Sequence, residues 1–169
     1  MNIDAEYQVP MGKTNEKLYL PIIRKQYGDV KISKYSLSVM DFIGENIKIE
    51  LKSRTCSYET FNTTMLGYNK ILMARKKPNK RYVYLFAFID GLYAWEYSLE
   101  NYLLTGGDDV IKAGDDPMNR DKLNFYIPIS QLTKISNQGC IITDAMKDKT
   151  IDIPLPKGKC FIKIKKSSC

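Results

Sequence analysis

Three charged residues, Asp41, Glu50 and Lys52, have the types and the order that metal-dependent cleavage of phosphodiester bonds requires. Carboxylate oxygens bind Mg²⁺, and a nearby lysine can hold a water molecule and offset negative charge on a phosphate. Glu50 and Lys52 belong to segment 46–54, which alternates apolar and polar residues as a half-buried strand does. The pattern predicts one polar face with Lys48, Glu50, Lys52 and Arg54, and one core face with Ile47, Ile49 and Leu51.

Segment 35–43 precedes this strand, and a two-residue turn at Gly44-Glu45 would join the two as a hairpin. In that register Asp41 lies opposite Lys48, and Glu50 is the diagonal neighbour of Asp41 on the same face. Diagonal neighbours have Cα atoms roughly 7 to 8 Å apart, so two carboxylates can converge on one ion. The simpler alternative is a half-buried hairpin whose polar face carries a cross-strand pair between Asp41 and Lys48.

Composition narrows the chemistry further. The 169 residues carry 26 Lys and Arg against 19 Asp and Glu, a formal net charge of +7. This excess favours a polyanionic partner such as nucleic acid, although solubility alone explains it equally well. The chain has no histidine, which excludes hydrolases with a Ser-His-Asp or Cys-His site and zinc sites built on His. Chemistry must rest on carboxylates, Lys, Tyr, Cys and metal.

The cysteines indicate reduced thiols rather than a zinc site or a disulfide framework, since positions 56, 140, 160 and 169 include no CxxC pair. The N-terminus is polar and no apolar run approaches the length of a membrane span, so we expect neither a signal peptide nor a membrane segment. We expect an intracellular, soluble protein of the cytoplasm or nucleus, or of a virion if the source is viral. The length favours a single domain over residues 1–169.

The elements that must position these residues alternate between helices and strands. Residues 1–14 lack periodicity and are expected to form an N-terminal arm, followed by an amphipathic helix over 15–27 that ends at Gly28. Pro21 favours a start of this helix near Leu20. The other expected strands lie at 35–43, 46–54, 81–89, 92–97 (after the turn Asp90-Gly91), 124–129, 140–143 and 160–164. Helices are expected at 63–76 and 130–135, and a long surface loop with room for one helical turn at 105–122. Thr63 or Thr64 would cap the helix over 63–76, with Met65, Leu72 and Met73 as its apolar contacts.

The expected order is a helix with a Glu, a strand ending in Asp, a strand with Glu-x-Lys, and then a further helix and strand. In this order of elements and motifs, the chain resembles the PD-(D/E)XK nuclease superfamily over about residues 14–98. The resemblance implies an α/β (α+β) fold, in which helices flank a central mixed β-sheet in the αβββαβ order of restriction endonucleases. It also implies Mg²⁺ held by Asp41 and Glu50, with Lys52 orienting or activating water. Glu16 would match the acidic residue that many members carry on the first helix.

Two departures from the family pattern refine the expected activity. Met40 stands before Asp41 where the motif has Pro, a substitution that many members tolerate. No Gln-x-x-x-Tyr sequence follows Lys52, so the resemblance points away from the exonuclease and helicase-nuclease branch and toward an endonuclease. On physical grounds, Asp41, Glu50 and the backbone carbonyl of Leu51 would suit Mg²⁺ beside a phosphate, with Mn²⁺ as a substitute.

Basic and aromatic residues supply the expected contacts with nucleic acid. Tyr68 and Lys70 could contact phosphate or complete the site, although solvated positions on a helix face explain them as well. Basic residues around Pro78 could neutralise a DNA backbone, and a solvated turn explains them equally. The predicted contacts are Lys48, Arg54, Tyr68, Lys70, Arg75, Lys76, Lys77, Lys80 and Arg81. A row of alternating aromatic residues, expected in the core rather than as a base-stacking surface, comprises Tyr82, Tyr84, Phe86 and Phe88.

The leading hypothesis is a Mg²⁺-dependent endonuclease that hydrolyses DNA phosphodiester bonds. The first alternative is a non-catalytic nucleic-acid-binding or structural protein, such as a virion or packaging component, that retains the nuclease fold. The second alternative is the same chemistry on RNA. Small nucleases of this fold often act as homodimers, and the sequence leaves that state open.

Overall fold

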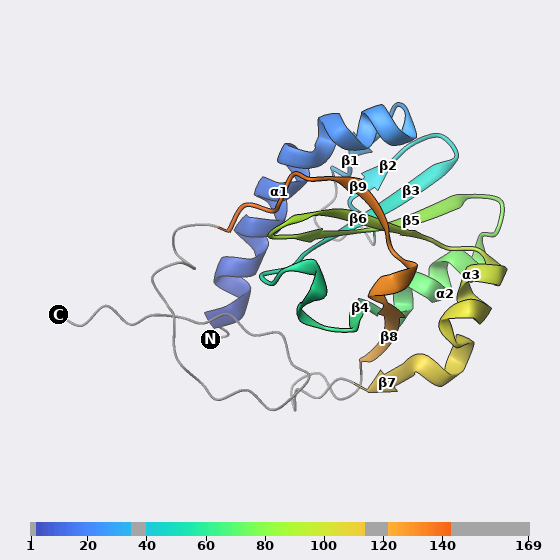
Figure 1. Cartoon of the computed structure of the whole chain (residues 1–169). Helices are drawn as coiled ribbons and strands as arrows, with labels where there is room; N and C mark the ends of the chain where they lie inside the picture. Colours follow the sequence, from blue (N-terminus) through green and yellow to red (C-terminus); the bar gives the residue numbers. More distant parts are fainter. Residues whose placement is uncertain (1–2, 35–39, 114–121, 143–169) are drawn as a thin grey trace.

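The computed structural model describes residues 3–34, 40–113 and 122–142 (Figure 1). The helices are α1 Ile3–Tyr27, α2 Tyr68–Lys76 and α3 Leu99–Thr105, with 3₁₀ turns η1 Tyr58–Thr60, η2 Gly107–Val110 and η4 Ile129–Gln131. The strands are β1 Lys31–Ile32, β2 Phe42–Ile43, β3 Ile47–Ser53, β4 Thr63–Gly67, β5 Arg81–Phe88, β6 Gly91–Glu96, β7 Ile111–Ala113, β8 Leu123–Pro128 and β9 Thr133–Ser136. They form a six-stranded sheet in the order β1-β2-β3-β5-β6-β9 and a three-stranded sheet in the order β4-β8-β7.

The larger sheet is mixed, because β3 runs parallel to β5 while its other neighbouring pairs are antiparallel. A parallel pair needs a crossover connection, which the chain makes through β4 and α2. This mixed sheet with its helices confirms the predicted α+β class. The predicted β5–β6 hairpin is also confirmed, although Phe88 pairs with Gly91 and the turn is therefore at Ile89-Asp90, one residue earlier than expected.

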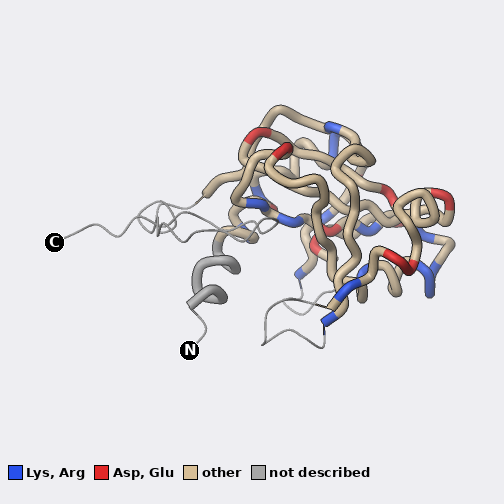
Figure 2. The backbone as a smooth tube through the Cα atoms, turned by 60° about the horizontal axis from the view of Figure 1, so that its bottom comes forward, with Lys and Arg blue, Asp and Glu red and all other residues tan. Residues whose placement is uncertain are grey.

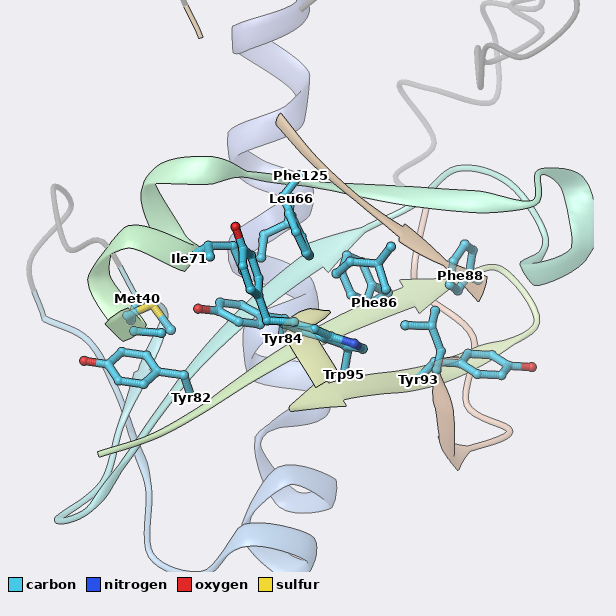
Figure 3. Packing of buried hydrophobic residues seen from close by; sticks show 14 residues of the cluster. Met40, Leu66, Ile71, Tyr82, Tyr84, Phe86, Phe88, Tyr93, Trp95 and Phe125 are labelled. Atoms are coloured by element: carbon cyan, nitrogen blue, oxygen red, sulfur yellow. The ribbon is translucent and has the colours of Figure 1, made fainter. Parts of the chain in front are cut away.

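The larger sheet separates two hydrophobic clusters. On one face, α1 packs Tyr19 and Ile23 against residues such as Ile49. On the other face lie α2, α3 and the smaller sheet, which cover the aromatic row of β5 (Figures 1 and 3). This row, whose assignment to the core is confirmed by its almost complete burial, comprises Tyr82, Tyr84, Phe86 and Phe88. Because β5 is buried on both faces, its sequence is a nearly continuous run of apolar and aromatic residues.

Helix α1 begins at Ile3, so the N-terminal arm predicted for residues 1–14 is wrong from residue 3 onward. Met11 and Asn15 are buried, and such tertiary contacts stabilise helical turns that the local sequence pattern does not reveal. Within the described residues, no helix combines the length and the apolar character that crossing a membrane would need.

The C-terminal end of α1 is confirmed. Gly28 follows the helix with a φ of 87° and donates its backbone N–H to the carbonyl oxygen of Arg24 over 2.9 Å. The start predicted from Pro21 is wrong, because this proline lies inside α1. Its missing N–H costs one backbone hydrogen bond, which the packing of Tyr19 and Ile23 on either side outweighs.

The helix predicted over residues 63–76 begins only at Tyr68, because residues 63–67 form β4. β4 pairs with β8, a strand far along the chain that local periodicity cannot identify. The predicted contacts of this helix change accordingly: Met65 and Leu72 are exposed, Met73 is partly buried against the core, and the buried residues of α2 are Ile71 and Ala74.

The remaining differences concern the C-terminal part of the chain. The loop expected at 105–122 contains η2 and β7 where it is described, and the helix expected at 130–135 is replaced by η4 and β9. Residues 140–142 are not a strand. Of the strand expected at 35–43, the described part is a strand only at Phe42–Ile43. The strand predicted at 160–164 lies outside the described residues, as do residues 35–39 and 143.

Candidate functional site

Asp41 lies where the pairing between β2 and β3 stops, and its side chain hydrogen-bonds to the backbone of β3 just beyond that point. β2 pairs with β3 over two residues only. Just before that pairing, the Asp41 N–H donates to the carbonyl oxygen of Ile49 over 3.0 Å. Asp41 Oδ2 accepts the N–H of Leu51 over 2.8 Å. The carboxylate thus occupies the edge of β3 that a longer β2 would have covered.

The register of this hairpin differs from the prediction by two residues. Lys48 does not lie opposite Asp41, because the turn is at residues 45–46. Gly44 lies inside the pairing, where an added Cβ would come within 2.7 Å of a neighbouring side-chain atom, so the glycine serves close approach and not the turn. A shift of two residues leaves every side chain on its face of the sheet, and Asp41 therefore stays close to Glu50.

Glu50 is a buried acid, and one of its two carboxylate oxygens pairs with two lysines. Its side chain is 3% exposed, and its Oε1 lies 2.7 Å from Lys52 Nζ and 2.8 Å from Lys70 Nζ. Its Oε2 is buried and has no hydrogen-bond partner among the described residues. The face predicted as a polar edge is thus covered at Glu50. An unpartnered buried carboxylate oxygen is costly, so a cation or a donor at this oxygen would stabilise the site.

Tyr84 places Lys70 over Glu50. In the parallel pairing of β3 with β5, Glu50 lies beside Tyr84. The Tyr84 hydroxyl donates to the backbone carbonyl oxygen of Lys70 over 2.8 Å and so fixes the first turn of α2 above the two strands. Burial raises the pKa of Tyr84, with smaller contributions from Tyr82 and Glu50, so the hydroxyl remains a donor. Figure 3 shows Tyr84 within the hydrophobic cluster that also contains Ile71 of α2.

Two acids of the site, Asp41 and Glu16, have raised pKa values. Burial, followed by the charge of Glu50, raises the pKa of Asp41 to about 6, against the lowering effects of the Leu51 N–H and of the two lysines. Burial, followed by the charge of Asp41, also raises the pKa of Glu16, which Lys13 lowers. Since like charges raise a carboxyl pKa only at short range, Glu16 lies within electrostatic reach of the other two.

The oxygen donors around Asp41 and Glu50 suit a hard divalent cation. Leu51 directs its N–H at Asp41, and because the N–H and C=O of one strand residue face the same edge, its carbonyl oxygen also faces this edge. Two carboxylates and a carbonyl fit Mg²⁺, which keeps several water ligands. Within the described residues, no three or more His, Cys, Asp or Glu side chains form a complete metal centre.

Arg54, predicted to contact nucleic acid, is engaged inside the fold. It donates to Thr64 Oγ1 over 3.1 Å and to the carbonyl oxygen of Met65, and its guanidinium lies 5.6 Å from the centre of the Phe86 ring. These contacts join the end of β3 to β4. Lys70, by contrast, is brought into the site and touches Glu50.

Of the basic residues around Pro78, some pair with other residues of the chain and some are exposed. Arg81 forms a bidentate pair with Glu96 over 2.9 and 3.0 Å, and Lys80 Nζ donates to the carbonyl oxygen of Glu45. Figure 2 shows basic positions spread over several segments, with acidic positions between them. The exposed members of the cluster include Lys76 and Lys77.

Tyr68 and Arg75 belong to a separate cluster at α2. Arg75 Nη1 donates to the Tyr68 hydroxyl over 3.2 Å, lies 3.7 Å from Asp108 Oδ1 and stacks over the ring of Tyr102. These contacts link α2 to η2 and α3. The predicted roles of Tyr68 and Arg75 in nucleic-acid binding thus meet competing intramolecular contacts.

Asn15, which precedes Glu16 on α1, is a buried residue that the sequence analysis missed. Its Nδ2 donates to Ser53 Oγ and to the carbonyl oxygen of Ile141, both over 3.1 Å, and its Oδ1 accepts the N–H of Ile141 over 2.8 Å. It thereby anchors this turn of α1 to the end of β3. A polar residue on the buried stripe of a helix was the available signal.

Asp41, Glu50, Lys52 and Lys70 therefore form a polar cluster between β3 and α2, next to the point where the pairing of β2 with β3 ends, with Glu16 nearby. It combines buried carboxylate oxygens with ammonium groups. Comparisons with models of protein families, with curated proteins and with solved structures found no match for this chain.

Proposed function

We propose that the protein is a Mg²⁺-dependent endonuclease that hydrolyses DNA phosphodiester bonds, with Asp41 and Glu50 as metal ligands and Lys52 as the residue that positions water. The observation that carries the proposal is the buried, unpartnered Oε2 of Glu50 beside Asp41. Partly buried acids with a raised pKa destabilise a fold and concentrate at functional sites. The position of Asp41 beside this unpartnered oxygen favours a role in binding a cation.

The metal ligands would be Asp41, Glu50 Oε2 and the carbonyl oxygen of Leu51, with Glu16 as a further acid within electrostatic reach. When bound, Mg²⁺ lowers the pKa of a coordinated water molecule and neutralises charge on the phosphate. Mn²⁺ accepts the same oxygen ligands and would substitute for it.

Lys52 is suited to act on water and phosphate together. Its Nζ lies 2.7 Å from Glu50 Oε1 while its side chain is 37% exposed, so it reaches both the buried acid and the solvent. Its ammonium group can donate a hydrogen bond to the attacking water and offset negative charge that develops on the phosphate. Phe86 lies beside Lys52 in the β3–β5 pairing.

One observation favours a second function, a non-catalytic nucleic-acid-binding or structural protein. Lys52 and Lys70 both compensate Oε1 of Glu50, and a buried ion pair can persist as a purely structural element. In that case the exposed Lys76 and Lys77 would bind phosphates without turnover.

A cleavage assay separates the two functions. Purified protein is incubated with supercoiled plasmid, single-stranded DNA and RNA, each in Mg²⁺, Mn²⁺ or EDTA. We expect nicked and linear plasmid with either metal ion and none in EDTA. Asp41→Asn and Glu50→Gln should lose more than the roughly 10- to 100-fold that second-shell residues of metal sites contribute. Glu59→Gln, which neutralises an exposed acid of η1, is the control and should retain activity.

The alternatives have their own signatures in the same assay. Gel retention of DNA without cleavage in Mg²⁺, unchanged in Glu50→Gln, would favour the binding protein. Cleavage of RNA in preference to both DNA substrates would keep the chemistry and change the substrate class.

A further inference from the structure

The negative charges around Glu50 lie close to positively charged lysines of the same chain. Asp41 and Glu50 face the ammonium groups of Lys52 and Lys70. The next acid outward, Glu16, lies near a further lysine, Lys13. A divalent cation would therefore enter a cluster that already holds ammonium groups, two of them paired with Glu50, and these groups must oppose its binding.

Lys70 is the cation best placed to compete with a metal ion. Its side chain is 13% exposed, against 37% for Lys52, while both Nζ atoms lie within 2.8 Å of Glu50 Oε1. Water and salt screen a buried charge less than an exposed one, so Lys70 repels a second cation more strongly. The hydrogen bond from Tyr84 to the Lys70 carbonyl oxygen anchors the backbone from which this ammonium group reaches Glu50.

We propose that Lys70 is a resident counter-ion of Glu50 that competes with the divalent metal ion and lowers the metal affinity of the free protein. This inference rests on the proposed metal site and gives Lys70 a part in regulating that site. A phosphodiester brings a negative charge toward the same ammonium group, which can then pair with the phosphate instead of with Glu50 alone. Metal ion and nucleic acid consequently assist each other's binding, as linkage requires for any such coupling.

The test measures binding of Mn²⁺ alone to the full-length protein, by electron paramagnetic resonance of the free ion and by isothermal titration calorimetry. Lys70→Met removes the charge and nearly preserves the length of the side chain, and it should tighten Mn²⁺ binding on the order of tenfold. Lys70→Arg keeps the charge and should bind Mn²⁺ as the wild type does. Lys76→Met removes an exposed charge from the same helix and is the matched control, with little expected change.

Two further variants make the measurement specific. Glu50→Gln should abolish the Mn²⁺ binding that the other variants modulate, which assigns the binding to this cluster. Thermal unfolding verifies that each variant is folded. If Lys70→Met does not fold, Lys70→Gln removes the charge but keeps a hydrogen-bond donor for Glu50, and the same tightening is expected of it.

The outcomes separate this inference from the nuclease function. Unchanged or weaker Mn²⁺ binding by a folded, uncharged variant at Lys70 overturns the inference, even if the wild type cleaves DNA. Tighter binding by that variant, together with a wild type that cleaves no substrate, supports the inference and removes the nuclease function. If no variant binds Mn²⁺, the metal site and the inference fail together.

Discussion

The hydroxyl group of Tyr84 donates a 2.8 Å hydrogen bond to the backbone carbonyl oxygen of Lys70, whereas the hydroxyl of Tyr82, on the same face of β5, is buried without a partner among the described residues. We expect Tyr84→Phe to lower the free energy of unfolding by about 1 kcal/mol, because it removes a buried hydrogen bond between β5 and α2. Tyr82→Phe should leave this free energy unchanged or raise it. Urea titrations measure both, and a larger loss for Tyr82→Phe would contradict the assignment.

The stability of the fold should depend on the ionisation of Asp41. The pKa of this carboxyl is raised from 3.8 to about 6 in the folded protein, so the folded state holds the proton more tightly than the unfolded state. The wild type therefore loses stability as the pH rises from about 4 to about 6, by at most about 3 kcal/mol.

Asp41→Asn isolates this effect. Asn cannot ionise but keeps an oxygen that can accept the N–H of Leu51. The variant should be more stable than the wild type at pH 7, and this advantage should shrink as the pH falls toward about 4. Chemical denaturation at several pH values gives the comparison, and parallel stability curves for the two proteins would disprove a raised pKa.

Two glycines provide a matched pair for the packing of the segment after β9. An added Cβ at Gly139 would overlap the backbone carbonyl oxygen of Ile89, whereas one at Gly12 in α1 would meet no atom within 4 Å. Gly139→Ala should destabilise the protein by about 1 to 3 kcal/mol. Gly12→Ala should stabilise it by up to about 1 kcal/mol, because alanine favours a helix interior. Thermal unfolding of the two variants should move in opposite directions.

Asn15 should be more important for stability than any single partner of its side chain. Asn15→Ala removes three hydrogen bonds in a buried place, and we expect a loss of about 2 to 3 kcal/mol. Ser53→Ala removes only one of them, and the Asn15 amide keeps its bonds to Ile141, so its effect should be about 1 kcal/mol or less. Equal losses in urea titrations would show that the contact with Ile141 contributes little.

The strand that carries the candidate site could be predicted because its signal is local. Ile47, Ile49 and Leu51 are buried on one face of β3, as the two-residue alternation indicates. The same alternation does not reveal whether the opposite face is covered. Glu50 was expected on a polar edge and is instead buried under α2.

Pairing between distant strands explains why the position of Lys70 could not be predicted from the local sequence. Lys70 reaches Glu50 because β4 pairs with β8 and delays the start of α2 to Tyr68, and this partnership joins segments far apart in sequence. The hairpin register was missed for another reason. A glycine between two strand-like segments indicates a turn position, and the turn was therefore placed at Gly44. In the structure Gly44 precedes the turn, and a glycine is required there because a neighbouring side chain approaches its backbone closely.

The cap that Asp41 places on the edge of β3 also bears on self-association. A foreign extended segment could add to β3 only by displacing this carboxylate from the Leu51 N–H and placing its own carbonyl beside a charged group. Removal of the side chain, as in Asp41→Ala, frees the Leu51 N–H to donate to such a segment. Concentrated solutions of that variant should accordingly form aggregates more readily than the native chain.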